Sequence, residues 1–189
     1  GAMSAGVLVT RGARLHIDRS RIDLSDLLPL DLKAIRKKDS GARTGPKAAF
    51  LGELKFLFPD RVSRGIVLPF GIYYEHYRRA VVHLPEGLKE QGIAREGESL
   101  PKFAERTYAE FFGKLLKSKK TEVELSAWIK PRLEILQFSI RATPISPALK
   151  KALWEEFARQ GLMKNPRTGE VVGCFVRSDT NVEDRQSCN

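Results

Sequence analysis

Three amphipathic segments, residues 101–117, 121–140 and 146–161, constrain the fold more than any other feature of the sequence. In these segments apolar side chains recur three and four positions apart, which is the spacing of one face of an α-helix. We expect the three helices to pack together in a compact fold. Six side chains on them are predicted to supply most of the core: Phe111, Leu115, Leu133, Leu136, Leu153 and Phe157.

Local signals support the starts of the second and third of these helices. Thr121 and Glu124 have the spacing of a capping box, in which each side chain satisfies a free backbone amide of the other. Ser146 followed by Pro147 is typical of a helix start. Pro131 lies inside the second segment and lacks an amide donor, so we expect it to kink or restart that helix.

Strand signals are fewer. Residues 65–70 and 171–176 are short apolar runs with β-branched members, and each is predicted to be a buried strand. Cys174 lies inside the second run, which predicts an inert thiol in the core. Since the strands are few and separated by helices, we predict an α/β (α+β) fold that is rich in helix.

The first hundred residues divide into an arm, two helices and a loop. Residues 1–44 are predicted to form a strand hairpin, within residues 7–18, followed by an irregular connecting arm. A helix is expected over residues 47–57, with Ala48, Leu51, Leu54 and Phe58 on its apolar face, and another over residues 71–82. Residues 85–100 are expected to be a loop.

The charge of the chain favours anionic partners. Lys and Arg number 33 against 23 Asp and Glu, which gives a formal net charge of +10 and a pI of about 9.8. Nucleic acid, a membrane surface or a phosphorylated small molecule would suit this balance, although a solvated basic surface is the simplest interpretation. No RNA-recognition signature or zinc-finger spacing is present, which argues against nucleic acid as the partner.

The sequence also bears on location. No apolar run approaches the roughly 20 residues that span a bilayer, so we expect no membrane-spanning segment. Cys174 and Cys188 do not make a disulfide framework, and a reducing cytoplasm is therefore the expected compartment.

Residues 175–184, Phe-Val-Arg-Ser-Asp-Thr-Asn-Val-Glu-Asp, carry the most informative chemistry. An arginine stands at the end of the predicted strand, where ligands bind in α/β folds. Its guanidinium matches phosphate oxygens, and the small polar residues after it allow backbone amides to approach an anion. The alternative from these residues alone is an ordinary strand exit, in which Arg177 pairs with Glu183 or Asp184.

This segment resembles a motif of the pyruvate phosphate dikinase and phosphoenolpyruvate synthase family, which also includes glucan water dikinase. The family pattern reads roughly V-R-S-S-x-x-x-E-D-L-P, and its arginine contacts ATP phosphates. The resemblance implies ATP binding by Arg177, Ser178, Asp179 and Thr180.

A second match lies upstream, where Gly45-Pro46-Lys47-Ala48-Ala49-Phe50-Leu51-Gly52-Glu53-Leu54 resembles the family's G-x-K-A-x-N-L-x-x-L. The lysine of that motif also contacts ATP phosphates, which makes Lys47 the remaining candidate. Arg64-Gly65-Ile66-Val67-Leu68-Pro69 resembles a further landmark, a turn that enters a strand. The three matches occur in the family's order.

The resemblance implies that residues 45–189 are the front part of an ATP-grasp-like nucleotide-binding domain, truncated at the C-terminus. The parent protein would be a phosphotransferase that passes a phosphoryl group from ATP, through a histidine of another domain, to pyruvate. The phosphohistidine domain, the pyruvate-binding domain and the ligands for Mg would lie downstream. We therefore expect no catalytic or metal-binding residues in this chain, and no ATP hydrolysis by the chain alone.

Two departures from the family pattern leave alternatives open. Phe50 stands where the family has asparagine, and Arg185 follows Asp184 where the family has Leu-Pro. A non-catalytic nucleotide-binding or scaffold module of the same fold is therefore one alternative, and a glucan water dikinase-like enzyme is another.

Overall fold

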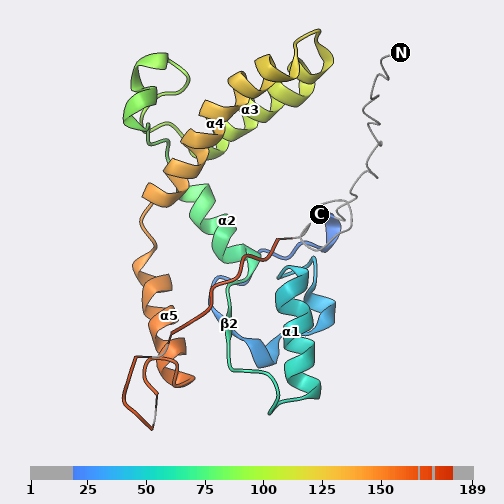
Figure 1. Ribbon diagram of the computed structural model, residues 1–189, viewed down its shortest axis with the longest axis vertical. Coiled ribbons are helices and arrows are strands. Elements are labelled where there is room, and N and C mark those ends of the chain that lie inside the picture. The colour runs from blue at the N-terminus through green and yellow to red at the C-terminus, as the bar shows by residue number, and fades with distance from the viewer. Residues whose placement is uncertain (1–18, 166, 172, 181–189) are drawn as a thin grey trace, which may run out of the picture.

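The computed structural model describes residues 19–165, 167–171 and 173–180, and shows a helix-rich α+β protein with one small antiparallel sheet in that part of the chain (Figure 1). The α-helices are α1 (Pro46–Leu57), α2 (Phe70–Arg79), α3 (Leu100–Gly113), α4 (Glu122–Ala142) and α5 (Pro147–Arg159). The strands are β1 (Leu30–Asp31) and β2 (Ile66–Val67). Short 3-10 helices complete the description: η1 (Arg19–Arg21), η2 (Leu32–Ala34), η3 (Lys37–Asp39), η4 (Glu86–Gln91) and η5 (Leu115–Lys117). The predicted hairpin of residues 7–18 lies outside the described residues.

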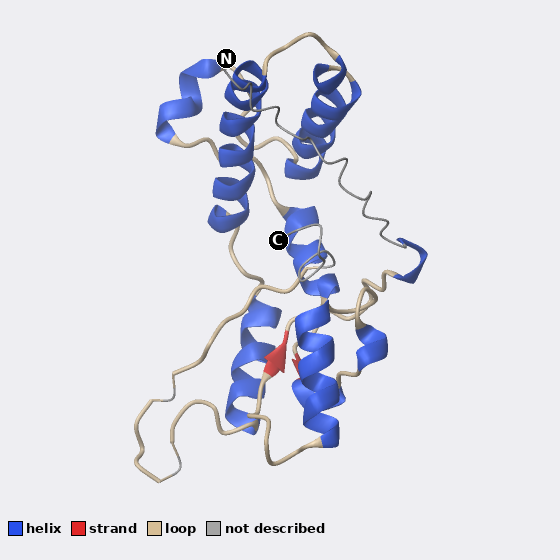
Figure 2. Ribbon diagram, turned by 45° about the vertical axis from the view of Figure 1, so that its right-hand side comes forward, coloured by secondary structure: helices blue, strands red, loops and turns tan. Residues whose placement is uncertain are grey.

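The elements form two groups joined by α2. The sheet, α1 and α5 make one group, and α3, α4 and η4 make the other (Figures 1 and 2). Each group has its own cluster of buried apolar side chains, and the two clusters have no residue in common.

In the first group the predicted strand of residues 65–70 is shorter than expected. Only Ile66–Val67 pairs, and its partner β1 belongs to the arm that was predicted to be irregular, with Leu30 opposite Val67. Leu32, Ile35 and Val67 are buried together beneath this pairing. The arm is therefore part of the core of this group.

Helix α1 was predicted correctly in position but with the wrong buried face. Its buried residues are Ala49 and Gly52, whereas Leu51 and Leu54 are 38% and 47% exposed. The reason is close approach: a Cβ atom on Gly52 would lie 2.5 Å from the carbonyl oxygen of Ile35. Only small side chains fit between this helix and the backbone of the arm.

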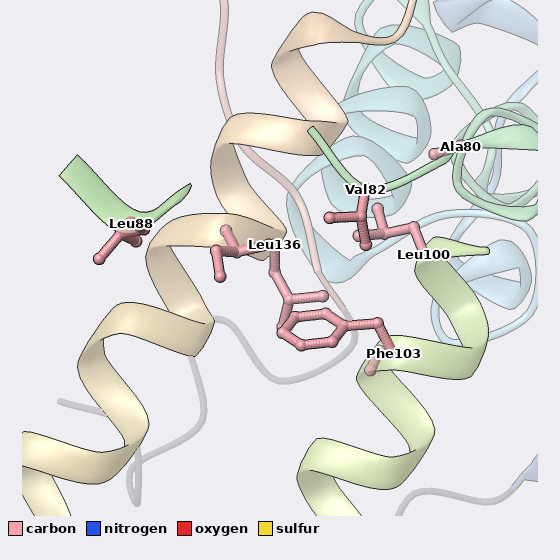
Figure 3. Close-up of a cluster of buried hydrophobic side chains, with 8 residues drawn as sticks. Ala80, Val82, Leu88, Leu100, Phe103 and Leu136 are labelled. Carbon is pink, nitrogen blue, oxygen red and sulfur yellow. The ribbon is translucent and has the colours of Figure 1, made fainter. Parts of the chain in front are cut away.

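In the second group, Phe103 of α3 extends toward α4 (Figure 3) and belongs to the same buried cluster as Leu136. Phe103 is 1% exposed and is one of the largest fully buried side chains of the described chain. The loop predicted for residues 85–100 contains the single 3-10 helix η4, whose Leu88 is buried in the same cluster.

The core predicted from helical spacing was mostly wrong. Of the six predicted residues only Leu136 is buried, at 7% exposure, while Leu133 is 38% exposed and Phe111, Leu115, Leu153 and Phe157 are partly exposed. The buried members of the cluster instead include Val82, in the connection after α2, and Leu100, the first residue of α3. Helical periodicity gives no signal at such positions.

The predicted helix starts are confirmed. At α4, Thr121 accepts from the amide of Glu124 at 3.2 Å, and Glu124 accepts from the amide of Thr121 at 2.7 Å. At α5, Ser146 accepts from the amide of Leu149 at 3.1 Å. Helix α4 continues through Pro131 as one element, so the predicted restart does not occur.

The predicted buried strand of residues 171–176 is wrong. Val171 makes one isolated bridge with Lys164, and Phe175 and Val176 are fully or almost fully exposed, at 101% and 94%. Cys174 is exposed as well, which corrects its prediction as a core thiol. No described neighbouring strand is available to bury this run, so its apolar composition does not produce a strand.

Candidate functional site

The start of α1 is a helix end without a local cap. Gly45 is the N-cap residue and has no side chain to offer, and Pro46 occupies the first helical position. The amides that follow, those of Lys47 and Ala48, need acceptors from elsewhere because the first turn of a helix has no internal partners for its donors.

Asp179 supplies these acceptors from the far end of the described chain. The amide of Lys47 donates to Oδ1 of Asp179 at 3.0 Å, and the amide of Ala48 donates to Oδ2 at 2.9 Å. A carboxylate in this position also interacts favourably with the positive end of the helix dipole. The segment after α5 runs back to the start of α1 to make this contact (Figure 1).

Gly45 makes the close approach possible. A Cβ atom at this position would collide with the Asp179 carboxylate and would lie 2.8 Å from the carbonyl oxygen of Thr180. Since its φ of −78° is available to any residue, the requirement for glycine is one of space and not of backbone conformation.

The turn before Gly45 is held by a buried carboxylate. Asp39 accepts from the amide of Arg36 at 2.8 Å and from Nε of Arg43 at 3.1 Å, while its carbonyl accepts from the amides of residues 42–44. Burial alone would raise the pKa of Asp39, but hydrogen bonds from Arg43 and the Arg36 amide hold it below its usual value. Arg43 also pairs with Asp26 at 2.9 Å, and these two hydrogen-bonded carboxylates raise its pKa. This network fixes the path of the chain into α1.

The structure brings the two predicted ligand-binding segments together. Lys47 and Asp179, 132 positions apart, meet through the backbone contact just described, and both are partly buried. Arg177, Ser178 and Thr180 are exposed on the same segment as Asp179.

Two features of the site were not predicted from the sequence. Asp179 was expected to bind a ligand directly, and its role as a helix cap was missed because no local signal links it to a helix so far away. The requirement for glycine at position 45 was missed for the same reason, although the combination Gly-Pro before a helix shows that the helix has no side-chain cap of its own.

Other chemistry in the described residues is sparse. They contain no group of three or more His, Cys, Asp and Glu that could hold a metal ion. His76 contacts the carbonyl of Ile140 at 2.9 Å, and Nδ1 of His83 contacts Glu96 at 3.1 Å, so both link neighbouring elements. Among the helices of the described part, none has the length and apolar character needed to cross a membrane.

Comparison of the chain with models of protein families, with curated proteins and with solved structures gave no match.

Proposed function

We propose that this chain carries the phosphate-binding front part of a nucleotide-binding domain, in a phosphotransferase that resembles phosphoenolpyruvate synthase and pyruvate phosphate dikinase. One observation carries the proposal. The two segments that resemble the family motifs are far apart in sequence, and Asp179 joins them at the start of α1. A triphosphate needs several cations and donors around it, and the two segments together offer Lys47, Arg177 and the hydroxyl groups of Ser178 and Thr180.

Each candidate residue has a role in this proposal. Lys47, on the first turn of α1, and Arg177 would contribute positive charge to the phosphates, and Arg177 could form a bidentate contact. The hydroxyl groups of Ser178 and Thr180 would donate hydrogen bonds. Asp179 would not contact the phosphates, because a carboxylate repels them. Its role would be to hold residues 177–180 beside the start of α1.

Phosphoryl transfer beyond ATP binding is assigned to other domains of a parent protein. Mg, when bound, neutralises charge on the phosphates, but the described residues do not include a cluster of carboxylates suited to it. On the family resemblance, we place the magnesium ligands and the catalytic residues in other parts of the parent protein. The acceptor domains, phosphohistidine and pyruvate-binding, would be its partners within the parent.

The alternative is a scaffold or nucleotide-binding module of the same fold without turnover. The observation that favours it is the Asp179 carboxylate itself, which accepts from the two amides that an anionic ligand would otherwise use at this helix start. A glucan water dikinase-like parent would share the ATP site and differ in the acceptor.

Calorimetric titration with ATP tests the proposal. Lys47→Ala and Arg177→Ala should each weaken binding by roughly 1.5–3 kcal/mol, the usual loss for a charged hydrogen bond. Lys150→Ala and Arg167→Ala are matched controls at exposed positions outside the site and should leave binding unchanged. An ATP affinity that is unchanged in both site variants, or no binding at millimolar ATP, would contradict the proposal. Equal competition by a single-stranded oligonucleotide would indicate a general polyanion surface instead.

A further inference from the structure

The outer face of α1 is apolar and is not covered by the rest of the described chain. The side chains of this face are between 38% and 56% exposed, and we call them the α1 stripe: Phe50, Leu51, Leu54, Leu57 and Phe58. They lie opposite Ala49 and Gly52, which face the arm. Helix α1 lies at the edge of its group of elements (Figure 1). Contiguous exposed apolar surface of this kind marks interaction sites.

The spacing of the α1 stripe fits a helical partner. Numbered as a heptad with Phe50 at d, Leu54 is at a, Leu57 is at the next d, and Leu51 is at e; Phe58 follows the helix as its C-cap residue. Positions a, d and e are those that a helix buries against another helix in a globular protein. With 12 residues at a rise of about 1.5 Å, α1 offers about 18 Å of length, which suits a partner helix of three to four turns.

The edges of the α1 stripe are basic. On one edge, Nζ of Lys37 lies 5.8 Å from the centre of the Phe50 ring. On the other edge, Lys55 donates to the carbonyls of Pro59 and Val62, so its charge is held in place beside the stripe without a carboxylate in those contacts. Lys47 is at heptad position a, at the N-terminal end of the stripe.

The surrounding segment has the same sign of charge. Residues 31–64 contain nine Lys and Arg and four Asp and Glu. Three of these four carboxylates are already engaged within the chain: Asp31 with Arg159, Asp39 with Arg43, and Glu53 with the amide of Lys37. A partner with acidic residues at its flanks would complement this surface, whereas a second copy of this basic chain would place like charges together.

From the stripe, its heptad spacing and its basic edges, we propose that α1 is a docking surface for an amphipathic α-helix that carries acidic residues beside its apolar face. Apolar contacts with the α1 stripe supply the binding, and Lys37 and Lys55 select for acidic flanks. This proposal is independent of ATP binding.

A pair of synthetic helical peptides tests it. Each is about 21 residues long, three heptads, with leucine at a and d; one has glutamate at e and g and the other has lysine there. The labelled peptides are titrated with the whole chain and followed by fluorescence anisotropy. We expect the glutamate peptide to bind about tenfold or more tightly than the lysine peptide, and its binding to weaken as salt is raised from about 0.05 to 0.5 M.

Three variants assign the binding to α1. Leu54→Glu should weaken the binding of the glutamate peptide about tenfold or more. The substitution removes an apolar residue from the core of the interface and adds a negative charge that repels the glutamates of the peptide. Val123→Glu is the matched control, because Val123 is a 79% exposed apolar residue on α4. Lys37→Glu should weaken the binding of the glutamate peptide and strengthen the binding of the lysine peptide. Circular dichroism and the melting temperature verify that each variant is folded.

Other results would overturn the proposal. Equal affinity for both peptides would exclude an acidic helix as the selected partner, and so would an affinity for the glutamate peptide that Leu54→Glu leaves unchanged. If sedimentation velocity showed a concentration-dependent dimer, and Leu54→Glu abolished it, the partner of the α1 stripe would be a second copy of the chain. Flotation with phosphatidylcholine and phosphatidylserine vesicles that the same substitution abolishes would make it a lipid surface.

Discussion

At the scale of single residues, the link between Asp179 and the start of α1 is the most consequential contact in the described chain. It joins the segment around Lys47 to the segment that follows Arg177. These two segments were identified from the sequence as separate candidates for phosphate binding. The family resemblance assigned both segments to one ATP site. The capping role of Asp179 could not be predicted, because a cap is recognised in sequence only when it lies next to its helix.

Gly45→Ala should break this link. The new Cβ would collide with the Asp179 carboxylate, so the cap should be lost at a cost of about 0.5–2 kcal/mol in the free energy of unfolding. Hydrogen exchange at the amides of Lys47 and Ala48 should become faster. Gly87→Ala is the control, because a Cβ there meets nothing within 4 Å. Unchanged protection of the two amides in Gly45→Ala would show that the contact does not hold in solution.

Asp39→Asn should change the dependence of stability on pH. The folded-state pKa of Asp39 is below its ordinary value of 3.8, so its contribution is present above that pH and is lost as pH falls through the folded-state pKa. The variant should be less stable at neutral pH by about 1–3 kcal/mol, since a buried hydrogen-bonded carboxylate is removed.

The pH profile separates this effect from a general loss of packing. Urea unfolding between about pH 7 and pH 2 should show the difference between the two proteins shrinking in acid, where Asp39 becomes protonated in the native protein. A difference that stays constant over this range would contradict the role given to the ionised carboxylate.

At the scale of elements, α1 shows how close packing can reverse an amphipathic pattern. Its length and position were predicted from apolar spacing, but its large side chains face outward because the backbone of Ile35 leaves space only for Gly52. Local signals placed the starts of α4 and α5 correctly, since a cap depends on neighbours in sequence. The run at residues 171–176 failed as a strand because strand formation requires a partner, which composition does not reveal.

Gly52→Ala and Leu54→Ala should therefore have effects opposite to those expected from the sequence. In an open helix, alanine is better than glycine by about 1 kcal/mol. Here the added methyl group would overlap the Ile35 backbone, and overpacking should cost about 1–3 kcal/mol. Leu54→Ala, on the exposed face, should change the free energy of unfolding by less than about 0.5 kcal/mol. Urea denaturation measures both, and a larger loss in Leu54→Ala than in Gly52→Ala would contradict this orientation of α1.

At the scale of the whole molecule, we expect the two buried clusters of the described chain to behave as two units of stability. Leu32, Ile35 and Val67 belong to one, and Phe103 and Leu136 belong to the other. Parts of a protein with separate cores can open with different free energies.

Phe103→Ala should reveal this division. Loss of a fully buried aromatic ring typically costs about 3–5 kcal/mol, and the half-buried Phe111 should cost less when changed in the same way. Hydrogen exchange should accelerate in α3 and α4 and remain slower in α1. Uniform acceleration through both groups would indicate a single cooperative unit.

The cap on α1 also has a consequence for the order of events during synthesis. The acceptor for the amide of Ala48 is the side chain of Asp179, which is synthesised 131 residues later. At ordinary rates of translation this is a delay on the order of ten seconds. Until then the nascent helix has an unsatisfied first turn. The α3–α4 pair, whose partners are close in sequence, can form while the ribosome is still at work. Within the described chain, the first turn of α1 is therefore completed only after α3 and α4 have been made.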